Sequence, residues 1–172
     1  MNQFWTNLRD GVESVSWFSE DELKASGGSK WERENPNYVP ARSVLEDVGM
    51  FDAAFFGYNP REAELMDPQH RIFLESAWQA LETAGYDPLT YQGLIGMYGG
   101  ANLSTYMLNM ASRPDLHDSL GNYELHYQIP VGNDKDSLAT GVSYKLNLKG
   151  PSLTVQTFCS TALVATHLAC QS

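Results

Sequence analysis

The residue with the clearest chemical potential in this sequence is a cysteine at the junction of two expected elements. Cys159 lies within VQTFCSTALVATHLACQS, residues 155–172, after a β-branched run and before an amphipathic pattern. A strand-to-helix junction lifts a side chain clear of the sheet, next to the free N–H groups of the helix's first turn. The partial positive charge of these groups favours a thiolate, and the groups can hold an oxyanion formed by attack on a thioester or ester.

Two interpretations of Cys159 stay open on this basis. The first is a nucleophile for acyl transfer, since Ser160, Thr161 and Ala162 are small and leave room for an acyl chain. The second is a small buried hydrophobic residue, the usual state of a free cysteine. Cys170 is expected to be buried in this way. About 16 Å of helix separates the two sulfur-bearing residues, so their thiols cannot pair within that helix.

A cysteine nucleophile usually works with a base, and none of the four histidines is well placed for that role. His167 lies on the same expected helix as Cys159, about 12 Å further along. His70 is expected on the surface or at the cap of a long helix, and His117 and His126 in solvated, turn-rich segments. The sequence also lacks the spacing of a zinc site, a phosphate-binding loop and a dinucleotide fingerprint, so no metal or bound cofactor is expected.

The elements that position Cys159 follow from hydrophobic patterns and turn residues along the chain. Strands are expected at the start of 43–57, over 93–101 and over 151–157. Helices are expected over 4–12, 67–85, 104–112, 134–147 and 160–170, and a surface loop over 26–37. Strands that alternate with helices predict a layered α/β fold.

The clearest helix is expected over 67–85. Asp67 can cap its start, Pro68 suits the first helical position and Gly85 suits the end. A broad apolar stripe runs along this helix and is formed by Ile72, Phe73, Leu74, Ala77, Trp78, Ala80 and Leu81. This stripe predicts that one face of the helix is buried in the core.

Composition and charge limit the kinds of partner. The chain has 172 residues, of which 42% are hydrophobic and 12% aromatic, enough for a globular domain with its own core. The formal net charge of −10 repels polyanions, so neither nucleic acid nor a membrane surface is expected as a partner. No apolar stretch approaches the roughly 20 residues that span a bilayer, and no signal-peptide pattern is visible. A cytoplasmic protein is expected, because the two cysteines form no disulfide framework.

The segment around Cys159 resembles the nucleophile segment of β-ketoacyl synthases, in particular the ketosynthase domains of modular polyketide synthases. That family's pattern reads close to T-A-C-S-[ST]-[SA]-L-V-A. The resemblance continues through GNDKDSLATGVSYKLNLKGPSLTVQT (132–157), DPQHRIFLESAWQALETAGYDP (67–88), FDAAFFGYNPREAELMDP (51–68) and FWTNLRDGVESVSWFSEDEL (4–23). It covers nearly the whole chain and favours the nucleophile interpretation of Cys159.

The resemblance implies a thiolase-like fold, with residues 1–172 as its amino-terminal half, a partial ketosynthase domain truncated at both ends. It implies that Cys159 accepts an acyl chain from the phosphopantetheine arm of an acyl carrier protein, and that the N–H of this cysteine forms part of the oxyanion hole. Decarboxylation of malonyl or methylmalonyl carrier protein then gives the carbanion that attacks the acyl-cysteine. The family also implies a homodimer for the full-length protein and no cofactor bound by this chain.

Several features depart from the family's pattern. Phe158 stands where the family usually has alanine, and Gly141 where relatives often carry arginine. The family's two catalytic histidines come from its second half, and no His-Gly pair occurs here, so these 172 residues alone are expected not to catalyse condensation. Two alternatives therefore stand beside the acyltransferase: a non-catalytic remnant used for dimerisation or docking, and a cysteine hydrolase of thioesters, which would need a base within this chain.

Overall fold

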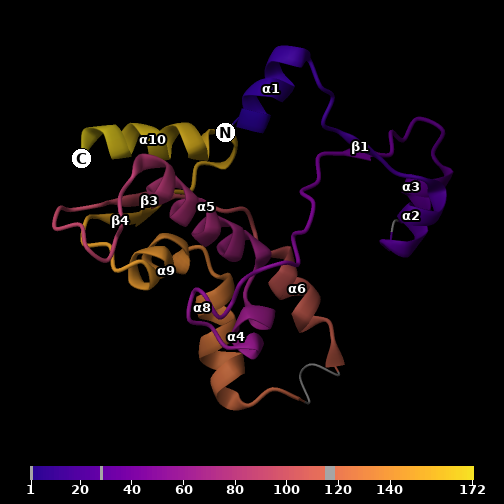
Figure 1. Cartoon of the computed structure of the whole chain (residues 1–172). Helices are drawn as coiled ribbons and strands as arrows, with labels where there is room; N and C mark the ends of the chain where they lie inside the picture. Colours follow the sequence, from indigo (N-terminus) through magenta and orange to yellow (C-terminus); the bar gives the residue numbers. More distant parts are fainter. Residues whose placement is uncertain (1, 28, 115–118) are drawn as a thin grey trace. The chain divides into compact units, whose positions relative to one another are not determined.

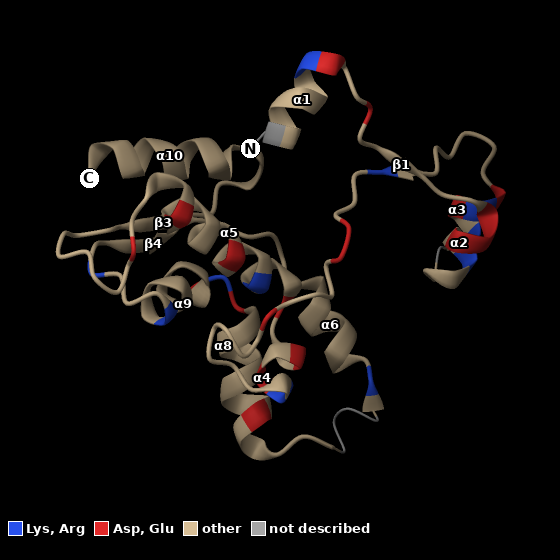
Figure 2. Cartoon of the chain, viewed as in Figure 1, with Lys and Arg blue, Asp and Glu red and all other residues tan. Residues whose placement is uncertain are grey.

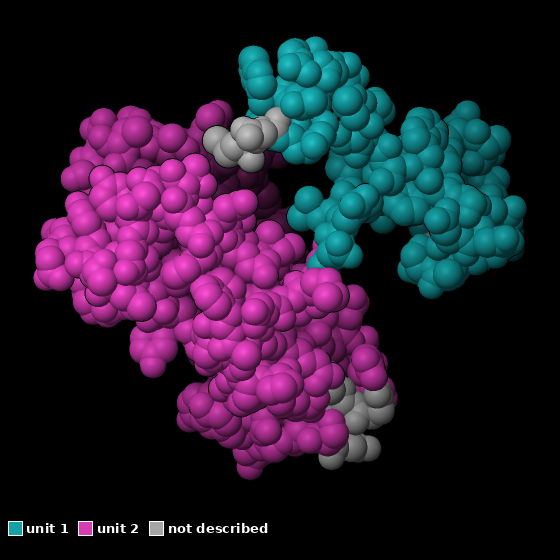
Figure 3. Space-filling view, viewed as in Figure 1, with its two compact units in different colours: residues 1–47 teal, residues 48–172 magenta. Residues whose placement is uncertain are grey.

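The computed structural model describes residues 2–27, 29–114 and 119–172. His117, for which the sequence predicts a solvated turn, lies outside the described residues. The chain divides into two compact units, residues 1–47 and 48–172 (Figure 3). Each unit has its own secondary structure. Among the described residues, no helix combines the length and the apolar character needed to cross a membrane.

The first unit consists of short elements. They are α1 (Asn2–Asp10), β1 (Ser16–Trp17), α2 (Glu20–Ala25), α3 (Lys30–Glu34) and β2 (Ala41–Arg42). The two strands pair antiparallel, with Ser16 opposite Arg42 and Trp17 opposite Ala41. The helix expected over 4–12 is confirmed as α1, which ends just before Gly11.

Capping boxes start both of the other helices in this unit. The Ser19 hydroxyl accepts a hydrogen bond from the N–H of Glu22, whose carboxylate accepts one from the N–H of Ser19. Ser29 and Glu32 repeat this arrangement at the start of α3. Such reciprocal bonds satisfy two helix-end donors at once. The prediction of a surface loop over 26–37 is therefore wrong for Lys30–Glu34, where the capping box starts a short helix.

The second unit holds the cysteines and is built from helices around a pair of strands. Its elements are α4 (Pro60–Leu65), α5 (Pro68–Ala84), β3 (Met97–Gly99), α6 (Thr105–Ala111), η1 (Glu124–Gln128), α8 (Ile129–Asn133), α9 (Ser137–Lys145), β4 (Ser152–Thr154), η2 (Phe158–Ser160) and α10 (Thr161–Gln171). β3 and β4 are parallel, with Tyr98 opposite Leu153. Parallel neighbours need a crossover connection, which here runs from α6 to α9. Figure 1 shows α10 on one side of the strands and α9 on the other, the layered α/β arrangement predicted from the sequence.

The long helix α5 confirms the clearest expectation of the sequence. The Asp67 carboxylate accepts a hydrogen bond from the N–H of Gln69 at 2.7 Å, and Gly85 ends the helix in the left-handed region at φ 77°. The buried stripe is narrower than expected, because Ala80 is exposed. The core cluster joins α5 to α9 and the segment that follows it, and consists of Leu74, Ala77, Leu81, Val142, Leu146 and Leu148.

The strand expected at the start of 43–57 is not formed, so that prediction is wrong. The segment makes turns instead, and the Asp52 carboxylate accepts a hydrogen bond from the N–H of Phe55 at 3.0 Å. Asp and Asn side chains favour such turns over strands. Apolar residues of the turn still reach the core, because the rings of Phe51 and Phe56 stack 5.4 Å apart and pack against the α5–α9 cluster.

The other two predicted strands form, but each covers only three residues. At the end of β3, the N–H of Val155 donates to the carbonyl oxygen of Gly99 at 2.8 Å. A β-carbon on the next residue, Gly100, would lie 2.3 Å from the carbonyl oxygen of Val155 and 2.3 Å from Cγ2 of Thr161. The end of β3 therefore meets the start of α10 at a point that has no room for a side chain.

Two glycine substitutions are expected to change stability in opposite directions. Gly100→Ala places a methyl group against a backbone oxygen and should destabilise the fold by about 1–3 kcal/mol, the usual cost of overpacking. Gly141→Ala in the middle of α9 meets open space and should stabilise the helix by about 1 kcal/mol. Urea unfolding midpoints check both. A midpoint that does not fall in Gly100→Ala would contradict the close approach there, and a midpoint that falls in Gly141→Ala would contradict the open space beside α9.

His70 lies in the core rather than on the helix surface or at its cap, so that prediction is wrong. Its side chain is only 8% exposed, and its Nε2 atom has no hydrogen-bond partner among the described residues. Burial lowers the pKa of His70, while the negative charges of Asp67, Asp134 and Asp136 oppose this effect. His126 is exposed, as expected, and His167 is exposed as well.

The buried histidine is expected to make stability depend on pH. Because folding lowers the pKa of His70, the unfolded chain binds a proton more readily below about pH 6.5, and stability falls as the pH is lowered through that range. His70→Gln should reduce the loss of urea midpoint between pH 7.5 and pH 5.5. His126→Gln replaces an exposed histidine and serves as the control. Its urea midpoint should fall between these two pH values by as much as that of the parent chain. Equal losses in the parent and in His70→Gln would contradict this assignment.

Candidate active site

Cys159 lies in a sharp turn between β4 and α10. Residues Phe158–Ser160 form one turn of 3₁₀ helix, and Thr161 then starts α10. Phe158 has a positive φ of 51°, which costs a residue with a β-carbon about 1–2 kcal/mol. The strand-to-helix junction expected from the sequence is therefore present, with a strained turn that the sequence did not predict.

Hydrogen bonds within 157–161 hold this turn. The N–H of Ser160 donates to the carbonyl oxygen of Thr157 at 3.3 Å, and its hydroxyl donates to the same oxygen at 2.9 Å. The N–H of Thr161 donates to the carbonyl oxygen of Phe158, and the N–H of Thr157 donates to the hydroxyl of Thr161 at 3.0 Å. The N–H of Cys159 takes part in none of these bonds. This N–H belongs to the first turn at the helix N-terminus, where backbone N–H groups have no acceptor within the helix.

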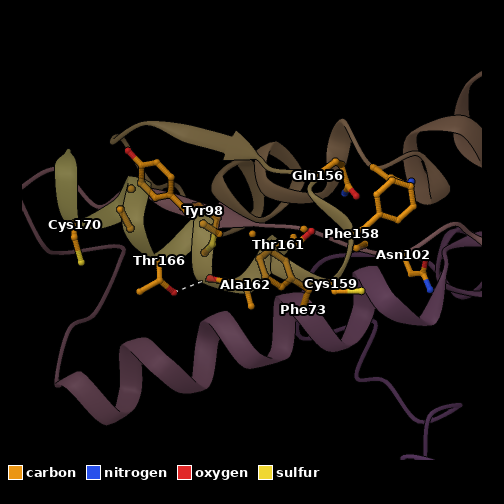
Figure 4. Close-up of a pocket in the computed structure, with 18 residues that line it drawn as sticks. Phe73, Tyr98, Asn102, Gln156, Phe158, Cys159, Thr161, Ala162, Thr166 and Cys170 are labelled. Carbon is orange, nitrogen blue, oxygen red and sulfur yellow. Dashed lines mark hydrogen bonds between the residues drawn. The ribbon is translucent and has the colours of Figure 1, made fainter.

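Both cysteines are exposed, which contradicts the expectation that Cys170 is buried and the alternative that Cys159 is. They line one cavity of about 1090 Å³ between α10 and the β3 segment. Figure 4 shows Cys159 beside Phe158 toward one end of this cavity and Cys170 toward the other. The sulfur of Cys159 is thus accessible to a molecule that enters the cavity.

The cavity has mostly small and uncharged walls. The α10 side presents Ala162, Ala165, Thr166 and Ala169. Of the three small residues that the sequence singled out, Thr161 and Ala162 line the cavity and Ser160 does not. The sequence did not identify the opposite wall, which includes Phe73, Tyr98, Gly99, Gly100 and Asn102; the glycine pair that ends the expected strand was the available signal. α10 carries no Lys, Arg, Asp or Glu (Figure 2). Among the described residues that line the cavity, Lys135 is the only one of these four types, and none is histidine.

A second cavity of about 420 Å³ lies beside α9 and contains no cysteine. Its lining includes His70 and also Gly141, the position at which the sequence departs from the family's pattern within α9. The Lys145 ammonium lies 3.5 Å from the centroid of the Tyr58 ring and donates to the carbonyl oxygen of Gly57 at 2.9 Å. Burial raises the pKa of Tyr58 to about 12 and lowers that of Lys145. No group of acidic, histidine or cysteine side chains suited to a metal ion occurs in the part of the chain that the structure describes.

Comparisons with known proteins identify relatives over the full length of the chain. Residues 1–172 match the family described as Beta-ketoacyl synthase, N-terminal domain. The chain is 46% identical over 176 residues to a component of the phenolphthiocerol/phthiocerol polyketide synthase of Mycobacterium tuberculosis, covering 100% of the chain and 12% of that protein. It is 37% identical over 172 residues to the pikromycin polyketide synthase component PikAII of Streptomyces venezuelae, covering 98% of the chain and 4% of that protein. The chain thus spans about an eighth or less of these relatives.

Solved structures give the same assignment. Ketosynthase twelve of the bacillaene polyketide synthase of Bacillus amyloliquefaciens superposes with a TM-score of 0.79 at 36% identity, covering 99% of this chain and 29% of that one. The ketosynthase from module 1 of the bacillaene synthase of Bacillus amyloliquefaciens superposes with a TM-score of 0.75 at 36% identity. The match covers 96% of this chain and 28% of that one. The expected thiolase-like fold, amino-terminal half, is thereby confirmed. The chain belongs to the β-ketoacyl synthase family, whose N-terminal domain it matches from Met1 to Ser172.

Proposed function

We propose that this chain carries the acyl-accepting part of a polyketide ketosynthase, with Cys159 as the nucleophile. The observation that carries this proposal is the exposed thiol in the turn before α10, open to a cavity large enough for an acyl group. Membership of the β-ketoacyl synthase family supports the proposal, since all the relatives described above are polyketide synthases or their ketosynthase domains.

The proposed reaction is thioester exchange. The thiolate of Cys159 attacks the carbonyl carbon of an acyl group carried on the phosphopantetheine of an acyl carrier protein. A bond forms between the cysteine sulfur and this carbon, the bond to the pantetheine sulfur breaks, and the leaving thiolate takes up the proton that Cys159 released. The N–H of Cys159 donates to the oxyanion formed in between, the kind of preorganised donor that lowers such barriers.

Condensation belongs to the complete ketosynthase in this proposal. Malonyl or methylmalonyl carrier protein loses carbon dioxide, and the carbanion attacks the acyl-cysteine to give a β-ketoacyl thioester. The family's two histidines assist this step, and we assign them to the second half of the fold. The partners are therefore an acyl carrier protein and a second ketosynthase copy, and the substrates arrive on phosphopantetheine rather than on a cofactor bound by this chain.

Acylation of the chain by an acyl-pantetheine thioester tests the proposed nucleophile. The parent chain should gain the mass of one acyl group, Cys159→Ala should gain none, and the matched control Cys170→Ser should gain as much as the parent. Intact-protein mass spectrometry with peptide mapping measures this, on samples whose circular dichroism shows folded chain. Acylation that persists in Cys159→Ala would overturn the assignment.

The same experiment separates the alternatives. A docking remnant without catalytic function would leave every thioester intact, and none of its cysteines would gain mass. A thioester hydrolase would release free acid in many turnovers without accumulating acyl-cysteine. Stable acylation of Cys159 with one acyl group per chain is expected only for the acyl-accepting site.

Condensation by the 172 residues alone is expected to fail. Charge develops on the malonyl thioester oxygen during decarboxylation, and loss of even one donor to such an oxygen commonly slows a reaction about 100- to 1000-fold. No histidine is among the described residues that line the cavity. With acyl-Cys159 and malonyl carrier protein present, we expect neither β-ketoacyl product nor carbon dioxide above background. Product that disappears in Cys159→Ala would show that a donor within this chain serves the step.

A further inference from the structure

The side chain that precedes the proposed nucleophile has an unusual position. Phe158 is 96% exposed, and it lines the same cavity as Cys159. Figure 4 shows the two side chains toward the same end of that cavity. Among the described residues that line the cavity, Phe158 is the only large apolar side chain that is exposed. A ring with this much apolar surface in water gains free energy when a hydrocarbon group covers it.

The backbone sets the direction in which the Phe158 side chain leaves the turn. The positive φ of Phe158 sets the direction of its Cα–Cβ bond, and hydrogen bonds hold the turn on either side of it. The carbonyl oxygen of Phe158 accepts from the N–H of Thr161, and that of Thr157 accepts from the N–H of Ser160. Because the turn is held in this way, the β-carbon of Phe158 keeps its place next to Cys159, and the ring turns about bonds that start beside the thiol.

The neighbouring wall offers apolar surface that is less exposed than the Phe158 ring. A β-carbon on Gly99 would lie 2.2 Å from Cζ of Phe73, and one on Gly100 would lie 2.3 Å from the carbonyl oxygen of Val155. The half-buried Phe73 ring therefore covers Gly99, Gly100 presents backbone, and α10 presents alanines. Of the large apolar side chains in the lining, Phe158 is the exposed one and is the neighbour of Cys159 in the chain.

We propose that Phe158 determines acyl specificity and makes Cys159 prefer long, unbranched hydrocarbon acyl groups over acetyl. This inference rests on the proposed acyl transfer to Cys159. The acyl carbonyl carbon is bonded to the sulfur during the reaction, so the next carbons of the chain lie within reach of the adjacent ring. Each methylene removed from water favours the bound state about fourfold, and an octanoyl chain has six methylenes where acetyl has none.

Acylation rates with two thioesters test this specificity. Octanoyl-pantetheine and acetyl-pantetheine are compared in the parent chain, in Phe158→Ala and in Phe158→Leu, by following acyl-Cys159 with intact-protein mass spectrometry. Phe158→Ala should lower the octanoyl-to-acetyl rate ratio about tenfold, through the octanoyl rate, and Phe158→Leu should lie between. Leu163→Ala, which removes a 77% exposed side chain of α10 outside the cavity lining, should leave the ratio within twofold.

Two outcomes would overturn the inference while leaving the proposed function intact. An equal fall of both rates in Phe158→Ala would mean that the ring acts only on the turn, and a higher octanoyl rate would mean that it obstructs the chain. If neither thioester acylates the parent, the proposed function itself fails. The effect of the Phe158 ring is then measured by alkylation of Cys159 with N-octyl iodoacetamide and with iodoacetamide. Phe158→Ala should lower the ratio of the octyl rate to the iodoacetamide rate about tenfold. An unchanged ratio would reject the contact between the ring and the alkyl chain.

Discussion

The position of the thiol depends on one close contact between backbones, at the end of β3. Because Gly100 has no side chain, the carbonyl oxygen of Val155 and the methyl group of Thr161 can both lie 2.3 Å from where a β-carbon would be. The hydrogen bond from Val155 to Gly99 brings β4 to this point, and Thr161 is the first residue of α10. The end of β4 and the start of α10 therefore meet the end of β3 at this point, and Cys159 lies in the turn between them.

The buried core and the turn that bears Cys159 are different parts of the second unit. The buried cluster that joins α5 to α9 contains no residue of the turn 157–161. The turn is held by its own hydrogen bonds and carries the strain of Phe158 at positive φ. Strained conformations persist only where the surroundings determine them, and here the two parallel strands and the start of α10 do so. The side chains near the thiol can thus differ from the family's pattern without disturbing the core.

Local signals made part of this structure predictable. Asp67, Gly85 and an apolar stripe identified α5, and the β-branched run before Cys159 identified the junction that bears the thiol. The predictions failed where a local turn competes with a strand or where tertiary contacts decide. Asp52 closes a turn in a segment apolar enough for a strand, and the exposure of Cys170 depends on which face of α10 its neighbours cover. The cavity wall opposite α10 comes from β3 and its flanks, so hydrophobic periodicity alone could not show it.

The contact at Gly100 also has a consequence for how the chain reaches its native state. Gly100 and Thr161 are 61 positions apart (161 − 100), and the helices of the crossover lie between them. Closing so long a loop costs entropy that is regained only when both ends meet, whereas each helix between them forms from local contacts. From this loop-closure cost, the turn that bears Cys159 is expected to form late in folding. While the chain is being synthesised, the cavity beside Cys159 is then completed only when α10 reaches the end of β3.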